Sequence, residues 1–188
     1  MKTVFLDRDG VINRNRKNDY VKSWDEFEFI PNSLRAIQRL TDAGHRLIVV
    51  TNQSCINKGI VAPRTLDGIH QRMMTEIERA GGRIHAIYHC PHRADEGCSC
   101  RKPKPGLLIQ AAHEHGIDLP QSYLVGDSIR DIAAGQQVGC QSVFVLTGNY
   151  SQVDDKQTHN PGSHDNLRTA KIFTDLYRAA LWILNDSD

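Results

Sequence analysis

Short runs of apolar residues alternate along this chain with longer segments in which apolar positions recur at the period of a helix. Val, Ile and Phe dominate the short runs with little polar alternation, as expected for strands of a parallel sheet covered on both faces. The runs predict strands at Thr3–Leu6, Arg46–Val50, Ile84–Tyr88, Tyr123–Val125 and Ser142–Leu146, with a weaker one at Lys171–Phe173. Helices are predicted over Pro31–Ala43, Pro63–Ala80, Pro105–His115, Ser128–Gln137 and from about Asp175 to Leu184.

Proline and glycine mark the ends of three of these helices. Proline suits the first helical turn because its missing N–H needs no partner there, and glycine suits the position after the last turn. The starts lie at Pro31, Pro63 and Pro105, and the following glycines are Gly44, Gly81 and Gly116. Strands alternating with helices predict a three-layer α/β fold with a Rossmann-like parallel sheet. A length of 188 residues fits a single domain spanning residues 1–188, with a sizeable core and no second domain.

Two long segments carry no regular pattern. Arg14–Phe29 comes shortly after the end of the first strand, so this segment could cover a site formed there. Residues 149–166 are polar, and we predict a mobile surface loop there.

The composition of the chain limits the kinds of binding partner to be expected. Lys and Arg number 23 against 22 Asp and Glu, so a net charge of +1 gives no reason to expect nucleic acid or an anionic membrane. No apolar run approaches the roughly 20 residues that a membrane span needs. The chain runs straight into a strand pattern with no signal peptide ahead of it. We therefore expect a cytoplasmic protein, a monomer acting on a small molecule.

The first strand ends in Asp7-Arg8-Asp9-Gly10, which places two carboxylates two residues apart. Ligands of open α/β sheets bind outside the carboxyl ends of the strands. There Asp7 and Asp9 can share a metal ion, and one can attack a substrate while the other handles a proton. A polar turn after a strand is the plain alternative, because Asp-Gly is also a turn dipeptide.

The second strand ends in Thr51-Asn52-Gln53-Ser54. A hydroxyl at a strand end, with the backbone N–H groups beyond it, suits a phosphate oxygen. A polar loop without a ligand is the alternative. The fourth strand ends at Gly126-Asp127, and Asp131 follows on the starting helix. Asp131 either supports Asp127 or is an acid of the first turn, where the helix dipole favours negative charge.

A cationic segment, Arg101-Lys102-Pro103-Lys104-Pro105-Gly106, precedes the third helix. Lys supplies a point charge and Arg a bidentate fork for phosphate, although solvated basic loops are common. Carboxylates, hydroxyls and cations would then meet at one edge of a parallel sheet. This group suits Mg²⁺, which binds a few carboxylates and bridges to phosphate oxygen.

Three of the five cysteines crowd beside a histidine in the segment 90–100. Cys90, His92, Cys98 and Cys100 supply three thiolates and one imidazole, a complete tetrahedral set for a structural Zn²⁺. An odd number of cysteines in a chain expected to be cytosolic argues against a disulfide framework. The loop ends directly at Arg101, so zinc would fix the backbone that presents the cations.

These segments, in this order, resemble the haloacid dehalogenase superfamily of phosphohydrolases. The resemblance implies that Asp7 is the nucleophile, forming an aspartyl-phosphate, and that Asp9 is the general acid and base. It implies that Thr51, Arg101 and Lys102 act on the phosphoryl group during catalysis. The implied substrate contacts are Asp7, Arg8, Asp9, Thr51, Asn52, Gln53, Ser54, Arg101 and Lys102. The implied Mg²⁺ ligands are Asp7, Asp9 and Asp127.

The zinc loop and the lack of a large cap narrow the resemblance to a subgroup containing heptose bisphosphate phosphatases and histidinol phosphatases. The sequence Arg101-Lys102-Pro103-Lys104-Pro105-Gly106 favours the heptose branch, whose reaction removes a C7 phosphate during nucleotide-activated heptose synthesis for lipopolysaccharide or a related glycan. Histidinol phosphate or another small phosphomonoester is the alternative substrate. A phosphotransferase with the same chemistry is another alternative, and so is a non-catalytic phosphate- or zinc-binding scaffold.

Three segments depart from the family pattern. Cys55 stands where glycine is usual, so the turn is reshaped or Cys55 is exposed and oxidisable. Ser128 stands where lysine is usual, which removes a positive charge beside the predicted metal. Arg14, Arg16 and Lys17 either hold a second substrate phosphate or form a solvated basic loop.

Overall fold

The computed structural model describes residues 2–16, 18–148 and 170–186. Within this part of the chain, a parallel sheet of six strands runs in the order β3-β2-β1-β4-β5-β6. The strands are β1 (Thr3–Leu6), β2 (Arg46–Asn52), β3 (Ala86–Cys90), β4 (Tyr123–Gly126), β5 (Gln141–Val145) and β6 (Lys171–Phe173). The predicted parallel α/β fold is therefore confirmed.

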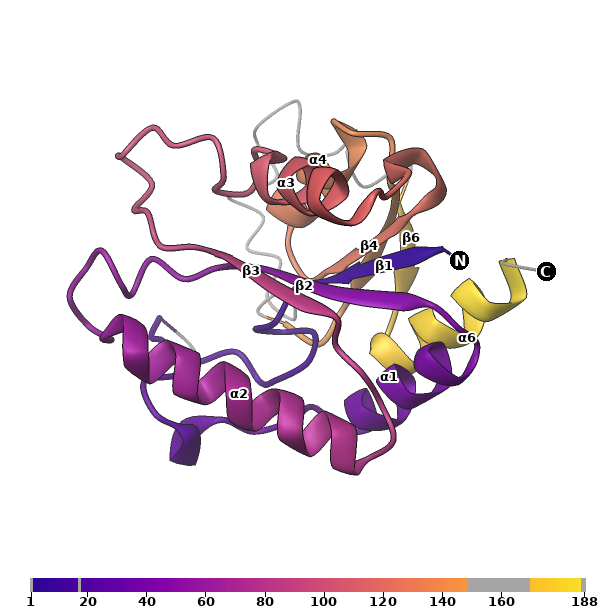
Figure 1. The fold of residues 1–188 in the computed structure, drawn as a ribbon, viewed down its shortest axis with the longest axis horizontal. Coiled ribbons are helices and arrows are strands. Elements are labelled where there is room, and N and C mark those ends of the chain that lie inside the picture. Colours follow the sequence, from indigo (N-terminus) through magenta and orange to yellow (C-terminus); the bar gives the residue numbers. More distant parts are fainter. Residues whose placement is uncertain (1, 17, 149–169, 187–188) are drawn as a thin grey trace.

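Helices cover both faces of the sheet, which gives three layers (Figure 1). The helices α1 (Ser33–Asp42), α2 (Pro63–Arg79) and α6 (Leu176–Asp186) cover one face, and α3 (Gly106–His115) and α4 (Ile129–Gln136) cover the other. Short 3₁₀ turns lie at η1 (Trp24–Glu26) and η2 (Leu119–Gln121). The described residues contain no helix with the length and apolar character that a membrane span requires.

The central strand β1 shows why the apolar runs lack polar alternation. Val4 and Leu6 belong to the cluster packed beneath α1, α2 and α6, whereas Phe5 belongs to the cluster beneath α3 and α4. All three are fully buried, because both faces of the sheet are covered. Each apolar position of such a strand therefore contributes to one of the two cores.

The strand order sets the position of the candidate site. From β1 the chain adds β2 and β3 on one side and then returns to add β4, β5 and β6 on the other. In open α/β sheets, ligands bind at this reversal, outside the carboxyl ends of the strands. The backbone N–H of Asp7 donates to the carbonyl of Val125 (2.9 Å), which joins the ends of β1 and β4 at that point.

The element boundaries agree with the prediction to within about two residues, and β3 shows the largest shift. We expected Ile84–Tyr88, whereas the strand spans Ala86–Cys90 because it pairs with β2 as far as Asn52 opposite Cys90. The first zinc-ligand candidate is therefore the last residue of a strand.

The segment 14–29 is more ordered in its packing than its irregular pattern suggested. Trp24 stacks on Phe27 with ring centroids 4.9 Å apart, and Phe29 meets Phe27 edge-on at 5.0 Å. Val21 and Phe27 are buried in the core beside α2. Its aromatic half thus anchors the segment beneath the sheet. The predicted mobile loop at 149–166 lies outside the described residues.

Two glycines near α2 give opposite predictions for an alanine substitution. Gly68 lies in the exposed face of α2 with open space around a Cβ, so Gly68→Ala should raise the free energy of unfolding by about 1 kcal/mol. At Gly82 a Cβ would lie 2.7 Å from Cγ2 of Ile37 and 3.0 Å from Cγ2 of Ile77. Gly82→Ala should therefore cost about 1–3 kcal/mol by overpacking. Urea unfolding of both variants tests this; equal effects would contradict the packing described at Gly82.

Candidate active site

Lys102 links three elements at the carboxyl edge of the sheet. Its ammonium lies 3.0 Å from Oδ1 of Asp7 and 2.5 Å from Oδ1 of Asp131, and it donates to the carbonyl of Val50 at 2.8 Å. The side chain is 3% exposed. Two carboxylates raise the pKa of Lys102 far above its usual value, more than offsetting its burial. The lysine is therefore a fixed positive charge beside Asp7.

Asp7, Asp127 and Asp131 form a crowded carboxylate group, with one oxygen of each within 4.8 Å of the others. Burial raises the pKa of Asp7 to about 6, with further increases from Asp131 and Asp9 that Lys102 partly opposes. Burial, together with the neighbouring carboxylates of Asp131 and Asp7, raises the pKa of Asp127 well above its usual value. One lysine does not neutralise three carboxylates, two of which are buried. The donor set thus fits a hard divalent cation such as Mg²⁺, which binds carboxylate oxygen.

Glycines allow the backbone to approach Asp127 closely. A Cβ on Gly10 would lie 2.1 Å from Oδ2 of Asp127, and one on Gly148 would lie 1.7 Å from the same oxygen. Gly10 also has a φ of +86°, which side-chain-bearing residues rarely adopt. The Oγ1 of Thr147 donates to the carbonyl of Gly10 (2.6 Å) and ties these two segments together.

Asp131 has the second of the two roles that the sequence left open, that of an acid in the first turn of α4. The backbone N–H and Oγ of Ser128 both donate to Oδ2 of Asp131, at 3.0 and 2.5 Å, so the carboxylate caps the start of α4. Its other oxygen meets Lys102. The serine that replaces the usual lysine of the family pattern therefore takes part in the cap.

Asp9 points into a different environment, although only one residue separates it from Asp7. Nε and Nη2 of Arg8 donate to its carboxylate at 2.9–3.3 Å, Nδ2 of Asn13 at 2.9 Å and Nε2 of Gln53 at 2.7 Å. Burial would raise the pKa of Asp9, but these donors together hold it below its usual value. These donors therefore favour the ionised form of Asp9, and its carboxylate is not in the group formed by Asp7, Asp127 and Asp131.

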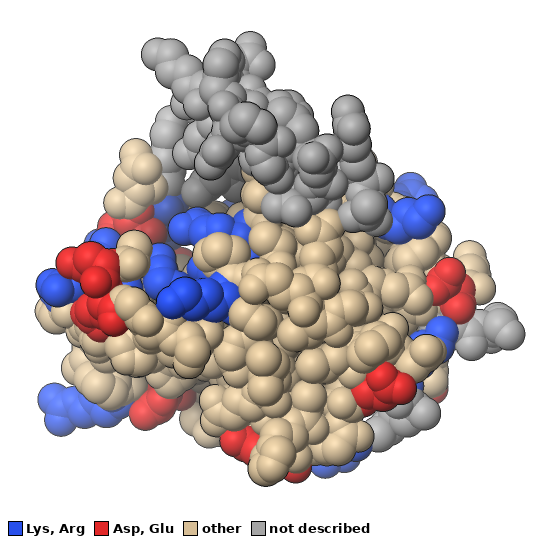
Figure 2. Space-filling model, turned by 90° about the horizontal axis from the view of Figure 1, so that it is seen from above, with Lys and Arg blue, Asp and Glu red and all other residues tan. Residues whose placement is uncertain are grey.

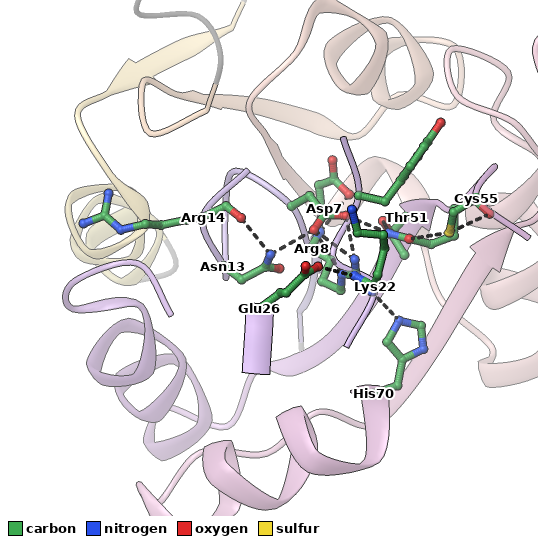
Figure 3. Close-up of polar contacts among 12 residues, drawn as sticks. Asp7, Arg8, Asn13, Arg14, Lys22, Glu26, Thr51, Cys55 and His70 are labelled. Atoms are coloured by element: carbon green, nitrogen blue, oxygen red, sulfur yellow. Dashed lines mark hydrogen bonds and ion pairs between the residues drawn. The ribbon is translucent and has the colours of Figure 1, made fainter. Parts of the chain in front are cut away.

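Arg8 is fully buried behind Asp9. Its Nη1 lies 3.0 Å from Nε2 of His70, a residue of α2 that points toward it in Figure 3. The structure thus places the side chain of Arg8 against Asp9 and His70, and the predicted contact of Arg8 with substrate stays a prediction.

The polar residues at the end of β2 and directly after it have distinct partners. Oγ1 of Thr51 accepts a hydrogen bond from Nε2 of Gln53 (3.0 Å), so both side chains are fixed beside Asp9. Asn52 grips the backbone of Lys102: its Nδ2 donates to the lysine carbonyl, and its Oδ1 accepts from the lysine N–H, both at 3.1 Å. Asn52 therefore positions the lysine.

The following turn faces the segment 14–29. Oγ of Ser54 lies 3.0 Å from the hydroxyl of Tyr20, which also accepts from Nζ of Lys58 at 2.9 Å. Cys55 is completely buried and packs with Val61 and Leu66. The expectation of an exposed, oxidisable Cys55 is therefore wrong, because the turn directs its side chain inward.

The predicted zinc ligands come together beside this turn. Sγ of Cys90 lies 3.7 Å from that of Cys98 and 3.2 Å from that of Cys100, and Nδ1 of His92 lies 3.2 Å from Sγ of Cys100. Sulfur ligands at tetrahedral zinc, with bonds of about 2.3 Å, lie roughly 3.7 Å apart. The four donors therefore have the chemistry and spacing to hold a zinc ion.

Other contacts tie this loop to the cationic segment. Nη1 of Arg101 donates to the carbonyl of His92 (3.1 Å), and Nζ of Lys104 donates to the carbonyls of Gly97 and Cys98 at 3.2 and 2.7 Å. Charged side chains of both signs gather at the end of the molecule where β1, β2 and β3 finish, while much of the same face is uncharged (Figure 2).

Two of the three cations proposed for a second phosphate already have acidic partners. Nε of Arg14 lies 2.6 Å from Glu28, and Nη2 of Arg16 lies 3.8 Å from Glu26. Lys17 lies outside the described residues. These ion pairs are exposed, so a stronger anion can displace them.

Sequence reasoning assigned no role in the site to Asn13 or His70. No motif marks Asn13, which follows Asp9 by four residues and reaches back to it. His70 did carry a signal: it lies among Leu66, Ile69 and Met73 on the buried face of α2, where a polar residue requires a partner.

Comparisons with known proteins agree with this geometry. The family model of haloacid dehalogenase-like hydrolases matches residues 11–136. A protein of Pseudomonas aeruginosa named D-glycero-beta-D-manno-heptose-1,7-bisphosphate 7-phosphatase is 46% identical over 145 residues, covering 77% of this chain and 81% of that protein. The enzyme of the same name from Neisseria meningitidis is 36% identical over 187 residues, covering 100% and 97%.

A solved structure is similar over nearly the whole chain. It is the D,D-heptose 1,7-bisphosphate phosphatase from B. bronchiseptica complexed with magnesium and phosphate. It has a TM-score of 0.88 and 39% identity, and the match covers 99% of each chain. With the family match and the carboxylate group at the end of β1, these likenesses show that the chain belongs to the haloacid dehalogenase-like hydrolase family.

Proposed function

We propose that this protein removes the C7 phosphate of D-glycero-β-D-manno-heptose 1,7-bisphosphate through an aspartyl-phosphate on Asp7. The observation that carries the proposal is the position of Asp7, at the carboxyl end of β1 against Lys102 and beside Asp127. The substrate follows from relatives that carry this activity in their names and align over the whole chain. The product would enter nucleotide-activated heptose synthesis in the cytoplasm.

In the first step, an oxygen of Asp7 attacks phosphorus, and the bond from phosphorus to the C7 oxygen breaks. Lys102 stabilises the negative charge of the phosphoryl group, and Thr51 and Arg101 orient it. A proton passes from Asp9 to the departing C7 oxygen. The phosphate's own charge beside Asp9 favours the protonated form that this transfer needs.

In the second step, water attacks the phosphorus of the aspartyl-phosphate. Asp9 accepts the proton of that water, and the carboxylate of Asp7 departs as inorganic phosphate forms. The ionised Asp9 held by Arg8, Asn13 and Gln53 is suited to this step, because a general base must begin without its proton.

Asp7 and Asp127 would hold Mg²⁺, with Asp131 beside them. A bound Mg²⁺ would neutralise the charge on the phosphate and on Asp7, so that the carboxylate can approach phosphorus. The family motif also assigns Asp9 to the metal. Its carboxylate is engaged by Arg8 in this structure, so that assignment stays a prediction.

The nucleophile can be tested by Asp7→Asn. The amide lacks the carboxylate's nucleophilicity, so we expect kcat to fall by more than about a thousandfold while the fold remains intact. The measurement is Mg²⁺-dependent phosphate release together with a circular dichroism melt. Asp42→Asn, an exposed carboxylate beyond the other end of the sheet, is the control and should keep full activity. Comparable activity in Asp7→Asn would eliminate the nucleophile assignment.

The zinc loop can be tested by metal analysis. We expect stoichiometric zinc in protein purified without chelator, and its loss in Cys98→Ser. Several kcal/mol of metal-dependent stability should disappear with it, lowering Tm by roughly 5–10 °C. Turnover should fall as well, because the loop leads into Lys102. Cys140→Ala, outside the cluster, should keep its zinc; zinc-free wild-type protein would contradict the assignment.

Substrate choice is tested by measuring kcat/KM for heptose 1,7-bisphosphate and histidinol phosphate side by side. The second phosphate offers additional charge-assisted hydrogen bonds, each worth roughly 1.5–3 kcal/mol, so we expect at least a tenfold preference for the bisphosphate. The Asp7→Asn variant controls for contaminating phosphatases. A preference for histidinol phosphate would leave the chemistry intact and overturn the substrate.

A further inference from the structure

His70 is a buried histidine that reaches the site from the helix layer. It lies on α2, is 6% exposed, and places Nε2 3.0 Å from Nη1 of Arg8. His89 of β3 meets its ring edge-on, with centroids 5.9 Å apart. The other hydrogen bonds of the arginine fork go to Asp9.

The chemistry of this contact fixes the state of the imidazole. Every nitrogen of a guanidinium is a donor, so Nε2 of His70 must accept and its proton must reside on Nδ1. Burial, Arg8 and His89 lower the pKa of His70 to about 3, which agrees with a neutral ring. His70 therefore offers Arg8 a permanent hydrogen-bond acceptor.

Arg8 needs that acceptor because its side chain is fully buried. Nε and Nη2 grip the carboxylate of Asp9, and within the described residues Nη1 makes no hydrogen bond apart from that to His70. A buried donor without a partner is costly, so removing the acceptor would favour rotation of the guanidinium away from this plane. Such a rotation would shift the carboxylate of Asp9, which accepts hydrogen bonds from this guanidinium.

We infer that His70 is a positioning residue, which orients Arg8 so that Arg8 holds Asp9 where it can transfer a proton to the leaving group. The inference rests on the proposed function of Asp9. Through His70, the buried face of α2 would help to position a catalytic group, although His70 itself does not touch the substrate. A displacement of about 1 Å in a reacting group can cost up to 100-fold in rate.

The test compares two leaving groups. A sugar alkoxide requires a proton to depart, whereas p-nitrophenolate is stable without one. In kcat/KM, which reports only steps up to the first irreversible one, His70→Leu should lose roughly 10- to 100-fold on the sugar phosphate. It should lose less than about threefold on p-nitrophenyl phosphate.

Two further variants test whether His70 acts by positioning Arg8 or only by filling space in the core. His70→Gln keeps an acceptor oxygen at similar reach and should recover most of the activity on the sugar phosphate. His45→Leu is the control, because His45 is also 6% exposed but lies directly before β2, away from the site. It should leave the ratio of the two kcat/KM values unchanged.

A double-mutant cycle with Arg8→Lys adds a second measurement. Lysine retains a charge for Asp9 but has no fork for His70 to orient, so His70→Leu should cause little further loss in that background. If His70→Leu does not fold, His70→Met supplies the same volume without a strong acceptor and is compared with His70→Gln.

Several outcomes would overturn the inference: equal losses on both substrates, full activity in His70→Leu, or a His70→Gln variant as impaired as His70→Leu. Failure of the proposed function looks different. Wild-type protein would then hydrolyse neither substrate with Mg²⁺. If only the heptose assignment is wrong, another alkyl phosphate that the wild type hydrolyses serves in its place.

Discussion

The buried ammonium of Lys102 is the contact on which the site depends. It meets Asp7 after β1, Asp131 of α4 and the carbonyl at Val50 of β2, so one charge joins three elements. Removing one partner of a buried ion pair leaves an uncompensated charge and is strongly destabilising. The same contact aligns Asp7, the proposed nucleophile, with the cation proposed to face the phosphate. Stability and chemistry therefore rely on the same side chain.

Asp7 and Asp9 show how one strand end can supply two carboxylates of different character. Asp7 lies among other carboxylates, and its pKa is raised to about 6, whereas Arg8, Asn13 and Gln53 hold the pKa of Asp9 below its usual value. Pairs of titratable groups with separated pKa values are typical of divided catalytic roles. The division arises from the partners of each carboxylate, since the two residues are almost adjacent in sequence.

The parallel sheet and the strand-end residues were predictable because buried strands leave a local signature and parallel strands finish at one edge. That logic correctly brought Asp7 and Asp127 together. It could not reveal the contact of His70 with Arg8, since residues 62 positions apart meet only through the packing of α2. Nor could it show that Cys55 turns inward, which depends on the path of the loop.

Both ends of the predicted zinc loop are bonded to the end of β2 or to the residue after it, which would allow a bound zinc ion to affect a site that it does not touch. At the entrance, the carbonyl of Cys90 accepts from the N–H of Gln53 (2.8 Å), and at the exit Asn52 grips both backbone groups of Lys102. Asn52, the last residue of β2, and Gln53, which follows it, thus set the register of both loop ends. A loop held at both ends by these hydrogen bonds fixes the direction in which the side chain of Lys102 points. The hydrogen bonds from Asn52 are therefore as much a part of the proposed phosphate site as the lysine charge, because a displaced charge loses most of its effect on a developing transition state.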